Sequence, residues 1–470
     1  MASQPLARAQ DARMLTGVGE ELMSRIVFRR TAVRFVYGTA FTLALACADA
    51  VAPTAPDAVT VADRRTGTAA AIQCDPDNAG LTLAADFCAL AVVKGVGRAR
   101  HMAVRPNGDL YVAIDNVPGG AVGGILALRD ADGDGRAEIQ ERFGDNGANG
   151  IAWSNGHLYF APNDRVVRYS FTGDELVPTA APEVIVSGLP IGGDHPRKSI
   201  AIDGAGNLFV NHGSASNTCQ VANRQLESPG MDPCPELETR SGVWRFSATA
   251  TGQTMANGER WSAETRNMNA LAINPADGLL YGAQNGRDQL FENWPALFDA
   301  RDDALLPSEE LFRLDRGKSY GWPYCYHDGV RNQKVLAPEY GGDGREIGRC
   351  ATRELPLADY PAHWAPLGMV FYVGNAIGNK YEGGLFIAFH GSRFDPRLQP
   401  AGPGYNVVFV NWEDGKPVGQ FETFADGFAG GDPSPTGAAH RPVSVAQATD
   451  GSLYVSDDRG GWIYRIVRAK

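Results

Sequence analysis

The sequence predicts an all-β protein, a six-bladed β-propeller, and two observations carry that prediction. One hairpin pattern occurs six times: an alternating apolar strand, a glycine turn, and a second strand that contains Leu-Tyr or Leu-Phe. The 470 residues also include 56 glycines and 29 prolines, which favour short strands joined by tight turns over long helices. A single blade cannot bury both faces of its sheet, so the six are expected to close into a ring around a polar channel.

The hairpins follow one another along the chain, with period-2 alternation on both sides of each turn. One aromatic residue marks each repeat: Tyr111, Tyr159, Phe209, Tyr281, Phe386 and Tyr454. The first three repeats are spaced at about one four-stranded blade, ~45 residues, or little more, whereas the later ones lie further apart. We therefore expect insertions between residues 210 and 385, gathered on the rim where propellers usually place their sites.

The first 72 residues are expected to lie outside the propeller. Residues 1–47 have the features of a secretory signal: a basic segment after Met23, which is a candidate for the true start, then an apolar stretch from Phe35 to Ala46 and small residues. That stretch is shorter than the ~20 residues needed to span a bilayer. Residues 48–72 form an Ala/Pro/Thr-rich linker without periodicity, which leaves 73–470 as one folded domain.

The cysteines indicate an oxidising compartment. Cys47 follows Ala44-Leu45-Ala46, which resembles a bacterial lipoprotein signal, and both a lipid anchor at Cys47 and simple cleavage nearby remain open. The other six form three local pairs that predict disulfides: Cys74 with Cys88, Cys219 with Cys234, and Cys325 with Cys350. We expect an exported protein that is periplasmic, membrane-anchored as a lipoprotein, or secreted. No CxxCH motif is present for covalent haem.

The formal charge of -11 at pH 7 excludes broad binding to the phosphates of nucleic acids. Such binding needs a basic stripe, and no run of Lys and Arg of that kind occurs in the sequence. The expected partner is therefore a small molecule.

Six short motifs in a fixed order resemble the glucose/sorbosone dehydrogenase family. They are GGDH at 192–195, RN at 266–267, QNGRD at 284–288, YGWPYC at 320–325, HGS at 390–392 and HRPVSV at 440–445. The resemblance covers about residues 90–470. It implies a soluble propeller enzyme that uses pyrroloquinoline quinone and Ca²⁺ to oxidise a sugar (aldose) or a related aldehyde or alcohol, with a separate electron acceptor.

His195 is the candidate catalytic base. It follows two glycines and precedes a strand, which places its ring at the rim, and a neutral imidazole suits the removal of a hydroxyl proton. The resemblance gives the matching histidine that role while hydride passes to the quinone; a loop histidine satisfied by hydrogen bonds is the alternative. Asp194 is expected to orient the ring or raise its basicity. By resemblance, Arg266 and Asn267 contact the reactive carbonyl of the cofactor, where a guanidinium stabilises developing negative charge.

The cofactor carries three carboxylates, and Arg441 matches a family arginine that binds one of them. Two departures from soluble glucose dehydrogenase are present: His390 stands where that enzyme has Lys, and Val443 where it has a second Arg. His390 and Arg393 are expected to substitute. These changes argue against glucose as the substrate more than against the cofactor.

A calcium site is expected in the QNGRD segment. By resemblance, the backbone carbonyls of Asn285 and Gly286 bind Ca²⁺ beside the quinone, with Asp288 as a supporting ligand. Carbonyl oxygens are suitable ligands for this hard cation, which can polarise the quinone as a Lewis acid.

A second segment has the spacing of a Ca²⁺ loop with oxygen ligands at alternate positions: Asp130, Asp132, Asp134 and Glu141. An apolar strand precedes it where a true EF-hand would have a helix. The alternatives are a metal-stiffened hairpin and a solvated acidic turn, both structural.

Three function classes remain. The first is the sugar or aldehyde dehydrogenase; the second is a propeller lactonase or similar Ca²⁺ hydrolase, which needs carboxylates around a channel metal. The third is a non-catalytic propeller that binds a protein or glycan. The combination of His195 with Arg266, Asn267 and Arg441 favours the first.

Overall fold

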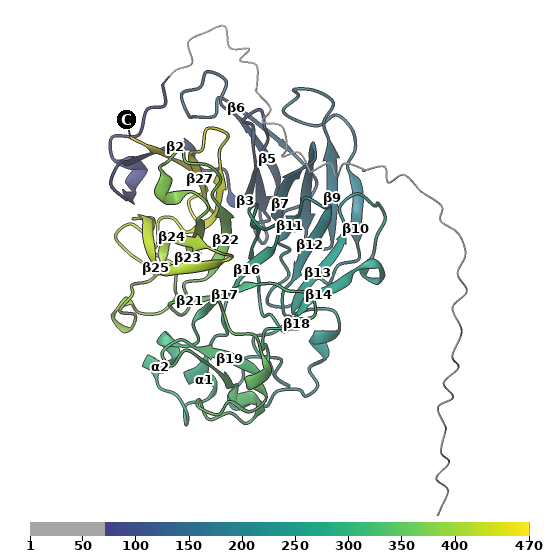
Figure 1. Cartoon of the computed structure of the whole chain (residues 1–470), viewed down its shortest axis with the longest axis vertical. Helices are drawn as coiled ribbons and strands as arrows, with labels where there is room; N and C mark the ends of the chain where they lie inside the picture. Colours follow the sequence, from purple (N-terminus) through teal and green to yellow (C-terminus); the bar gives the residue numbers. More distant parts are fainter. Residues whose placement is uncertain (1–70, 470) are drawn as a thin grey trace, which may run out of the picture. The chain divides into compact units, whose positions relative to one another are not determined.

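The structure is a computed structural model that describes residues 71–469. The predicted signal segment 1–47, the cysteine Cys47 and all but the last two residues of the predicted linker lie outside the described residues. Over the described range, no helix has the length and apolar character needed to cross a membrane. The chain forms the predicted six-bladed β-propeller (Figure 1).

Each blade is a sheet whose four main strands are antiparallel. Blades 1 to 3 contain β3 (Arg98–Val104), β4 (Leu110–Asp115), β5 (Gly124–Arg129) and β6 (Ile139–Phe143); β7 (Ala148–Ser154), β8 (His157–Pro162), β9 (Arg165–Ser170) and β10 (Glu183–Ser187); β11 (Ile200–Ile202), β12 (Asn207–His212), β13 (Gly242–Ser247) and β14 (Glu259–Ala263). Blades 4 to 6 contain β15 (Ala270–Ile273), β16 (Leu280–Gln284), β17 (Glu309–Arg313) and β21 (Ala358–Tyr360); β22 (Pro366–Phe371), β23 (Leu385–His390), β24 (Tyr405–Glu413) and β25 (Lys416–Asp426); β26 (Pro442–Gln447), β27 (Leu453–Asp457), β28 (Ile463–Arg468) and β2 (Phe87–Val93).

Shorter elements lie at the blade edges and in the connections. The short strands are β1 (Thr82–Leu83) beside blade 5, β18 (Lys318–Ser319) beside blade 3, and the separate hairpin of β19 (Cys325–Asp328) and β20 (Gln333–Leu336). The helices are α1 (Leu290–Asn293), α2 (Ala300–Leu305) and the 3₁₀ turns η1 (Asn78–Gly80), η2 (Pro235–Glu238), η3 (Met255–Asn257), η4 (Pro338–Tyr340), η5 (Gly348–Thr352), η6 (Asn379–Tyr381) and η7 (Pro396–Leu398).

The first strand of each blade lies at the axis. These inner strands contact one another in a closed cycle, from β3 through β7, β11, β15, β22 and β26 back to β3. Polar side chains join them: Arg100 Nε donates to Asn149 Oδ1 at 2.8 Å, and Asn149 Nδ2 donates to Ser199 Oγ at 2.9 Å. All three are buried, so polar side chains line the axis of the ring and join neighbouring blades through hydrogen bonds.

The six marker aromatics occupy the interfaces between blades, which explains why they recur. Each lies in an apolar cluster that joins its own blade to the next one around the ring. Tyr111 Oη donates to the carbonyl of Leu176 in blade 2 at 3.0 Å, and Tyr159 Oη donates to that of Ala248 in blade 3 at 3.0 Å. A tyrosine side chain therefore fills the interface between two blades with its aromatic ring and joins them through the hydrogen bond of its hydroxyl.

The last blade is completed by a strand from the beginning of the described chain. β2 pairs antiparallel with β28, with Leu90 opposite Arg465. Figure 1 shows purple β2 beside the yellow C-terminal strands. The Cys74–Cys88 disulfide fastens the preceding segment to β2. The propeller is thus closed by hydrogen bonds between its two ends.

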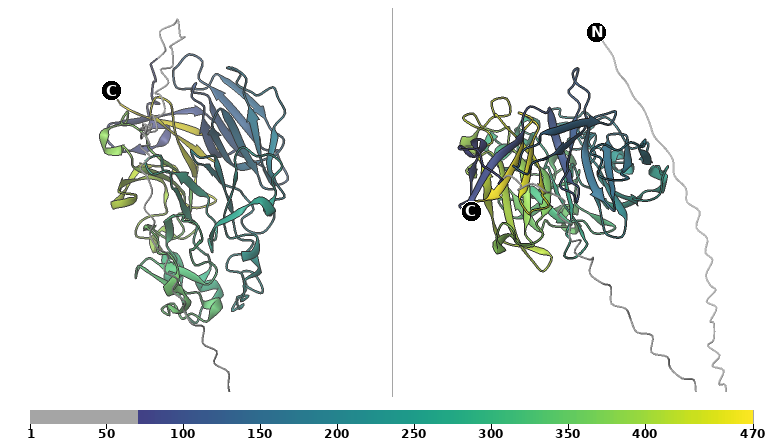
Figure 2. Two further views of the ribbon diagram at one scale, coloured as in Figure 1. Left: turned by 45° about the vertical axis from the view of Figure 1, so that its right-hand side comes forward. Right: turned by 90° about the horizontal axis from the view of Figure 1, so that it is seen from above.

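Long connections of blades 3 and 4 gather at one end of the ring, as predicted (Figures 1 and 2). The Cys219–Cys234 disulfide lies in the β12–β13 connection and the Cys325–Cys350 disulfide in the β17–β21 connection. Both disulfides pack in one apolar cluster with the side chains of Trp322 and Tyr324. All three predicted disulfides are therefore present, a feature typical of proteins outside the cytoplasm.

Candidate functional site

The predicted catalytic and cofactor-binding residues and the QNGRD turn lie at one end of the ring, and the strand order explains why. In an antiparallel hairpin the start of the first strand and the end of the second lie at the same end. His195, Arg266 and Arg441 precede the inner strands β11, β15 and β26, whereas Asn285 and His390 lie at or just after the ends of β16 and β23. The β12–β13 and β16–β17 connections leave from this same end, whereas the β17–β21 connection leaves from the other end and packs against the β12–β13 connection through its disulfide.

The imidazole of His195 is held through one nitrogen. Nδ1 lies 2.9 Å from Ser214 Oγ and 3.1 Å from the Ser214 carbonyl oxygen. The carbonyl can only accept, and the Ser214 hydroxyl already donates to the carbonyl of Ser216 at 2.7 Å. The proton of a neutral ring must therefore be on Nδ1, which leaves the lone pair on Nε2.

Burial and the nearby Arg266 guanidinium hold the pKa of His195 well below its ordinary value. The ring is therefore neutral at physiological pH, with Nε2 ready to accept a proton. No hydrogen bond within residues 71–469 ends on this nitrogen. The arrangement suits a general base.

Asp194 does not orient the ring, contrary to the prediction from sequence. Its carboxylate accepts from Arg224 Nε at 3.0 Å and from Asn223 Nδ2 at 3.4 Å. Both partners belong to the β12–β13 insertion, whose fold the sequence did not reveal. Ser214 takes the orienting position instead.

Arg266 is buried and bound on two sides. Its Nη2 donates to Asp288 Oδ2 at 3.0 Å and to Asn217 Oδ1 at 3.0 Å, and its Nε donates to the Asn217 carbonyl at 3.2 Å. The Asn217 amide also donates to the Asp288 carbonyl at 2.8 Å and its Oδ1 accepts from the Asp288 N–H at 2.9 Å. Asn217 thus joins the blade 3 insertion to both predicted site segments of blade 4.

Asp288 lies among cations. Burial raises its pKa, but Arg266, His363, Arg393 and Arg224 outweigh burial and hold the pKa well below its usual range. Arg393 Nε is 3.7 Å from the carboxylate. These charges argue against Asp288 as a supporting ligand for a metal and give it the role of fixing the arginines.

The predicted calcium carbonyls belong to a tightly held turn. Asn267 Nδ2 donates to Asn285 Oδ1 at 3.1 Å, the Asn285 N–H to the Asn267 carbonyl at 3.0 Å, and the Gly286 N–H to Glu309 Oε2 at 2.7 Å. In the described part of the chain no hydrogen bond ends on the carbonyl oxygens of Asn285 and Gly286. Burial raises the pKa of Glu309 to about 8. Two carbonyl oxygens without hydrogen bonds are chemically suited to a hard cation.

His390 and Arg441 come together where blades 5 and 6 meet. Arg441 Nε donates to the His390 carbonyl and Nη2 to the Gly391 carbonyl, each at 3.0 Å. His390 Nε2 lies 2.8 Å from Asp458 Oδ1, and Asp458 Oδ2 accepts from Arg100 Nη1 at 2.6 Å. Burial lowers the pKa of His390 against the attraction of Asp458.

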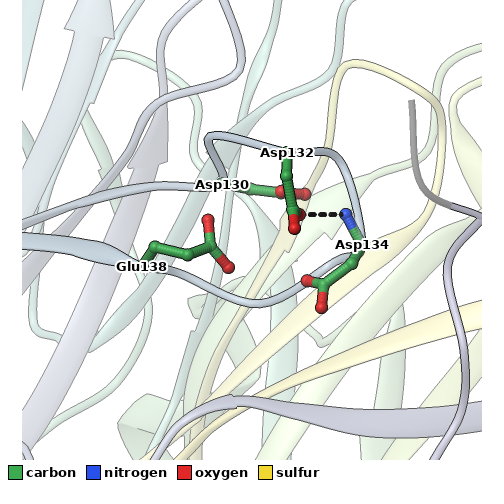
Figure 3. Close-up of side chains that lie close together, drawn as sticks. All are labelled: Asp130, Asp132, Asp134 and Glu138. Carbon is green, nitrogen blue, oxygen red and sulfur yellow. Dashed lines mark hydrogen bonds between the residues drawn. The ribbon is translucent and has the colours of Figure 1, made fainter. Parts of the chain in front are cut away.

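The acidic loop lies elsewhere, between β5 and β6, and differs from the prediction at one position. The carboxylates that converge are those of Asp130, Asp132, Asp134 and Glu138 (Figure 3). Glu141 does not take part, because β6 resumes at Ile139 and places Glu141 on that exposed strand opposite Ala127. Turn N–H groups already bind these carboxylates, as when Asp130 Oδ1 accepts from Gly133 at 2.6 Å.

Several residues that hold the site were not found from the sequence: Ser214, Asn217, Glu236, Glu309 and Asp458. Each acts on a partner that is distant in the sequence and is brought to it by the fold. The only local signal is the position of Asn217 and Glu236, two residues from Cys219 and Cys234 respectively.

The chain is similar to a family of known proteins over almost all of the described propeller. The model of the family described as TrAA12-like matches residues 81–469. A protein of Borreliella burgdorferi without an assigned function is 31% identical over 207 residues, which are 44% of this chain and 48% of that protein. The match thus spans about half the length of that curated relative.

Solved structures share the fold at low identity. The iodide and calcium structures of Trichoderma reesei Carbohydrate-Active Enzymes Family AA12 both have a TM-score of 0.67; at 19% and 18% identity they cover 83% and 85% of this chain and 98% and 99% of their own. The holo form of the pyranose dehydrogenase PQQ domain from Coprinopsis cinerea has a TM-score of 0.65 at 19% identity, covering 83% of this chain and 97% of that one. These likenesses show a common propeller.

Proposed function

Because the chain belongs to the TrAA12-like family, we propose that it is an oxidoreductase that uses pyrroloquinoline quinone and Ca²⁺ to oxidise a sugar or a related aldehyde or alcohol. The structures with the same fold support this choice, since one is a holo PQQ domain of a pyranose dehydrogenase and another a calcium structure of an AA12 enzyme. The single observation that carries the proposal is His195, neutral and with Nε2 unbound, at the same end of the ring as Arg266 and Arg441.

The side chains present fit a polyanionic cofactor. At the end of the ring that holds His195, three buried or largely buried arginines each have one guanidinium nitrogen without a hydrogen bond within residues 71–469: Nη2 of Arg100, and Nη1 of Arg266 and of Arg441. An unused guanidinium donor is well suited to a carboxylate or a quinone oxygen. Arg100 and Arg441 would bind the carboxylates, and Arg266 with Asn267 the carbonyl of the quinone.

The roles of the other residues follow from their geometry. The carbonyls of Asn285 and Gly286 would bind Ca²⁺. The bound quinone supplies a two-electron acceptor for hydride. His195 Nε2 removes the proton of the substrate hydroxyl, and the Ser214 carbonyl and hydroxyl then stabilise the imidazolium through Nδ1–H. Export, with the domain 73–470 free or anchored through Cys47, remains part of the proposal.

The alternatives are less well supported. A propeller lactonase needs free carboxylates around a channel metal, whereas Asp288 and Asp458 are both bound to arginines. A purely binding propeller would have no use for a base with a fixed proton position.

Reconstitution tests the proposal. Purified protein is loaded with pyrroloquinoline quinone and Ca²⁺ and given a panel of aldoses and aldehydes with a redox dye. Dye reduction by at least one substrate, dependent on the quinone, is the expected result. Absence of quinone binding and of turnover across the panel would favour the binding protein.

A further inference from the structure

The loop that carries His195 and the loop that carries Ser214 lie backbone against backbone. The Asp194 N–H donates to the Ala215 carbonyl at 2.8 Å. A Cβ at Gly193, whose φ is 75°, would lie 2.5 Å from Ala215 Cα, and a Cβ at Gly213 would lie 2.6 Å from His195 Cβ. Only glycine allows so close an approach at these two positions. The contact between His195 and Ser214 therefore depends on the backbone positions of both loops.

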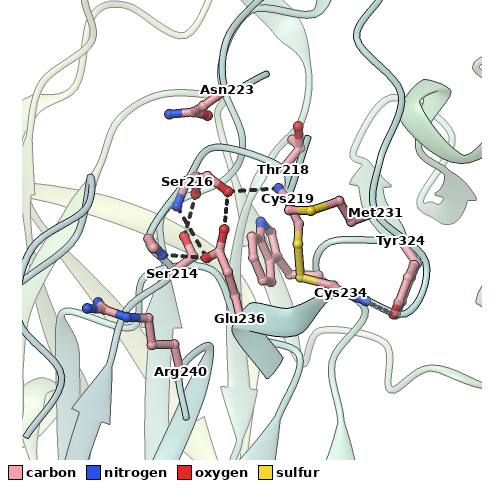
Figure 4. The surroundings of a disulfide bond; sticks show 12 residues. Ser214, Ser216, Thr218, Cys219, Asn223, Met231, Cys234, Glu236, Arg240 and Tyr324 are labelled. Carbon is pink, nitrogen blue, oxygen red and sulfur yellow. Dashed lines mark hydrogen bonds between the residues drawn. A yellow bond between two sulfur atoms is a disulfide. The ribbon is translucent and has the colours of Figure 1, made fainter. Parts of the chain in front are cut away.

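Glu236 holds the Ser214 loop. One carboxylate oxygen accepts from the N–H groups of Ala215 at 2.5 Å and Ser216 at 3.2 Å, and the other accepts from the Ser216 hydroxyl. The same hydroxyl accepts from the Cys219 N–H at 2.9 Å (Figure 4). No Lys, Arg or His within the described chain forms an ion pair with Glu236. Its charge is therefore directed to the backbone beside Ser214.

Arg240 holds the His195 loop from the same segment. Its Nη1 donates to the Gly192 carbonyl at 3.2 Å and its Nη2 to the Ile191 carbonyl. The backbone N–H of Arg240 donates to the Glu236 carbonyl at 2.9 Å. Glu236 lies in η2 and Arg240 follows its end, so both side chains extend from the same turn. The Cys219–Cys234 disulfide fixes the start of this turn. One short segment thus forms hydrogen bonds with both the His195 loop and the Ser214 loop.

We infer that Glu236 and Arg240 are positioning residues, which keep the acceptors of Ser214 against His195 Nδ1 and so keep the lone pair of the base on Nε2. This inference rests on the proposed function. The charges are suited to the task, because a carboxylate that accepts several backbone N–H groups and a guanidinium that donates to two carbonyls make stronger hydrogen bonds than neutral groups. Neither side chain touches the ring itself.

The position of the imidazole proton is measured directly. In the full chain labelled with ¹⁵N-histidine, a long-range ¹H–¹⁵N spectrum distinguishes a protonated from an unprotonated ring nitrogen, and His195→Ala assigns the signals of His195. The native protein should show protonated Nδ1 and unprotonated Nε2. Glu236→Ala should give averaged signals from both tautomers. Ser228→Ala is the matched control, because Ser228 Oγ lies in the same insertion and accepts from the Ala222 N–H at 2.9 Å, away from Ser214, and it should keep the native signals.

Kinetics supply the second readout. With pyrroloquinoline quinone bound, Glu236→Ala should lower kcat by about 10- to 100-fold, part of the ~10²- to 10⁴-fold contribution of a general base, and leave the dissociation constant of the quinone nearly unchanged. If Glu236→Ala does not accumulate, Glu236→Gln is measured in the same way, since it keeps the size but loses the charge.

The outcomes separate the two proposals. A folded Glu236 variant with native His195 signals overturns the positioning role whatever its activity. Averaged signals in a protein that oxidises no substrate would support the positioning role and count against the proposed oxidoreductase.

Discussion

The two ring nitrogens of His195 have different surroundings, and that asymmetry gives the first prediction. His195→Ala should lower kcat by ~10²- to 10⁴-fold, because the base is lost. The dissociation constant of pyrroloquinoline quinone should change little, since the ring acts on the substrate hydroxyl. Dye reduction and a quinone-binding titration measure the two quantities.

His157→Ala is the control for this variant, because His157 begins β8 and lies at the other end of the ring. His157→Ala should keep the native kcat and the native dissociation constant of the quinone. Near-normal turnover in His195→Ala would show that the base assignment is wrong and would direct the search to His390 or His212.

The second prediction concerns Arg441. Arg441→Met should weaken quinone binding by about 1.5–3 kcal/mol, the range for a hydrogen bond to a charged group, and leave turnover at saturating quinone largely intact. Arg459→Met is the control, because Arg459 binds the Thr436 carbonyl on the exposed surface. Equal effects of the two substitutions on quinone affinity would exclude Arg441 from the cofactor site.

At the scale of single residues, the sequence could point to candidates whose motifs are local, such as His195 in GGDH and Arg266 in RN, and their roles stay predictions. It missed Ser214, Asn217 and Glu236, because their partners come from other loops and no spacing records such contacts. The assignment of Asp194 failed for the same reason: a neighbour in sequence was preferred to Ser214, a neighbour in space.

Among the elements, the loop of residues 190–198 predicts a pH dependence of stability. Lys198 is fully buried and its Nζ donates to the carbonyls of Pro190 and Pro196, each at 2.8 Å. Burial, and then Arg240, lowers the pKa of Lys198 from 10.5 to about 7. Between these values the unfolded chain binds more protons than the folded one, so stability should rise with pH from about 7 to 10. Below pH 7 the cost of the buried charge is fully present.

Lys198→Met should remove this rise. Urea midpoints of the native protein and the variant at pH 6.5, 8 and 9.5 measure it. Lys318→Met, at an exposed lysine paired with Glu354, should retain the native pH slope. A native slope in Lys198→Met would mean that Lys198 titrates normally.

The QNGRD turn gives the fourth prediction. Removal of calcium with a strong chelator should abolish activity, and added Ca²⁺ should restore it, because the Lewis acid is lost and regained. The double variant Asp132→Asn, Asp134→Asn should respond identically, since the acidic loop lies apart from the site. If the activity of cofactor-depleted protein is unchanged by chelation and by reloading, a role for the metal is excluded. If the double variant no longer responds to chelation, the calcium site lies in the acidic loop instead.

The hairpins at the axis could be predicted from sequence because both strands are buried and their turns carry glycine. The outer strands could not: β6 is exposed at most positions and has no apolar alternation. The same difficulty explains why Glu141 was wrongly predicted to belong to the acidic loop. Its spacing fits a loop of twelve residues, but β6 begins at Ile139 and ends the loop earlier.

For the whole molecule, the critical element is β2. Leu90 is fully buried on this strand, opposite Arg465 of β28. Leu90→Ala should destabilise the propeller by about 2–5 kcal/mol, as expected for a large-to-small change in a core. Loss of one blade opens the ring, so tryptophan fluorescence and circular dichroism should report one common transition at lower urea. Val122→Ala, an exposed position, should leave the midpoint unchanged.

The number of blades was predictable because each interface needs a large aromatic residue at the same place, from Tyr111 to Tyr454. The closure by β2 was not. Its sequence, Phe87–Val93, is an apolar run without a hairpin partner next to it, and its true partner β28 lies at the far end of the chain.

This closure also governs the order of events during synthesis. Blade 6 contains the first long strand of the domain and the last, so the ring stays open until Ile463–Arg468 has left the ribosome. Until then blade 6 has an unpaired strand edge, and the propeller cannot reach its final stability against unfolding. The export proposed above would benefit from such a delay, because the propeller cannot close before β28 has been synthesised.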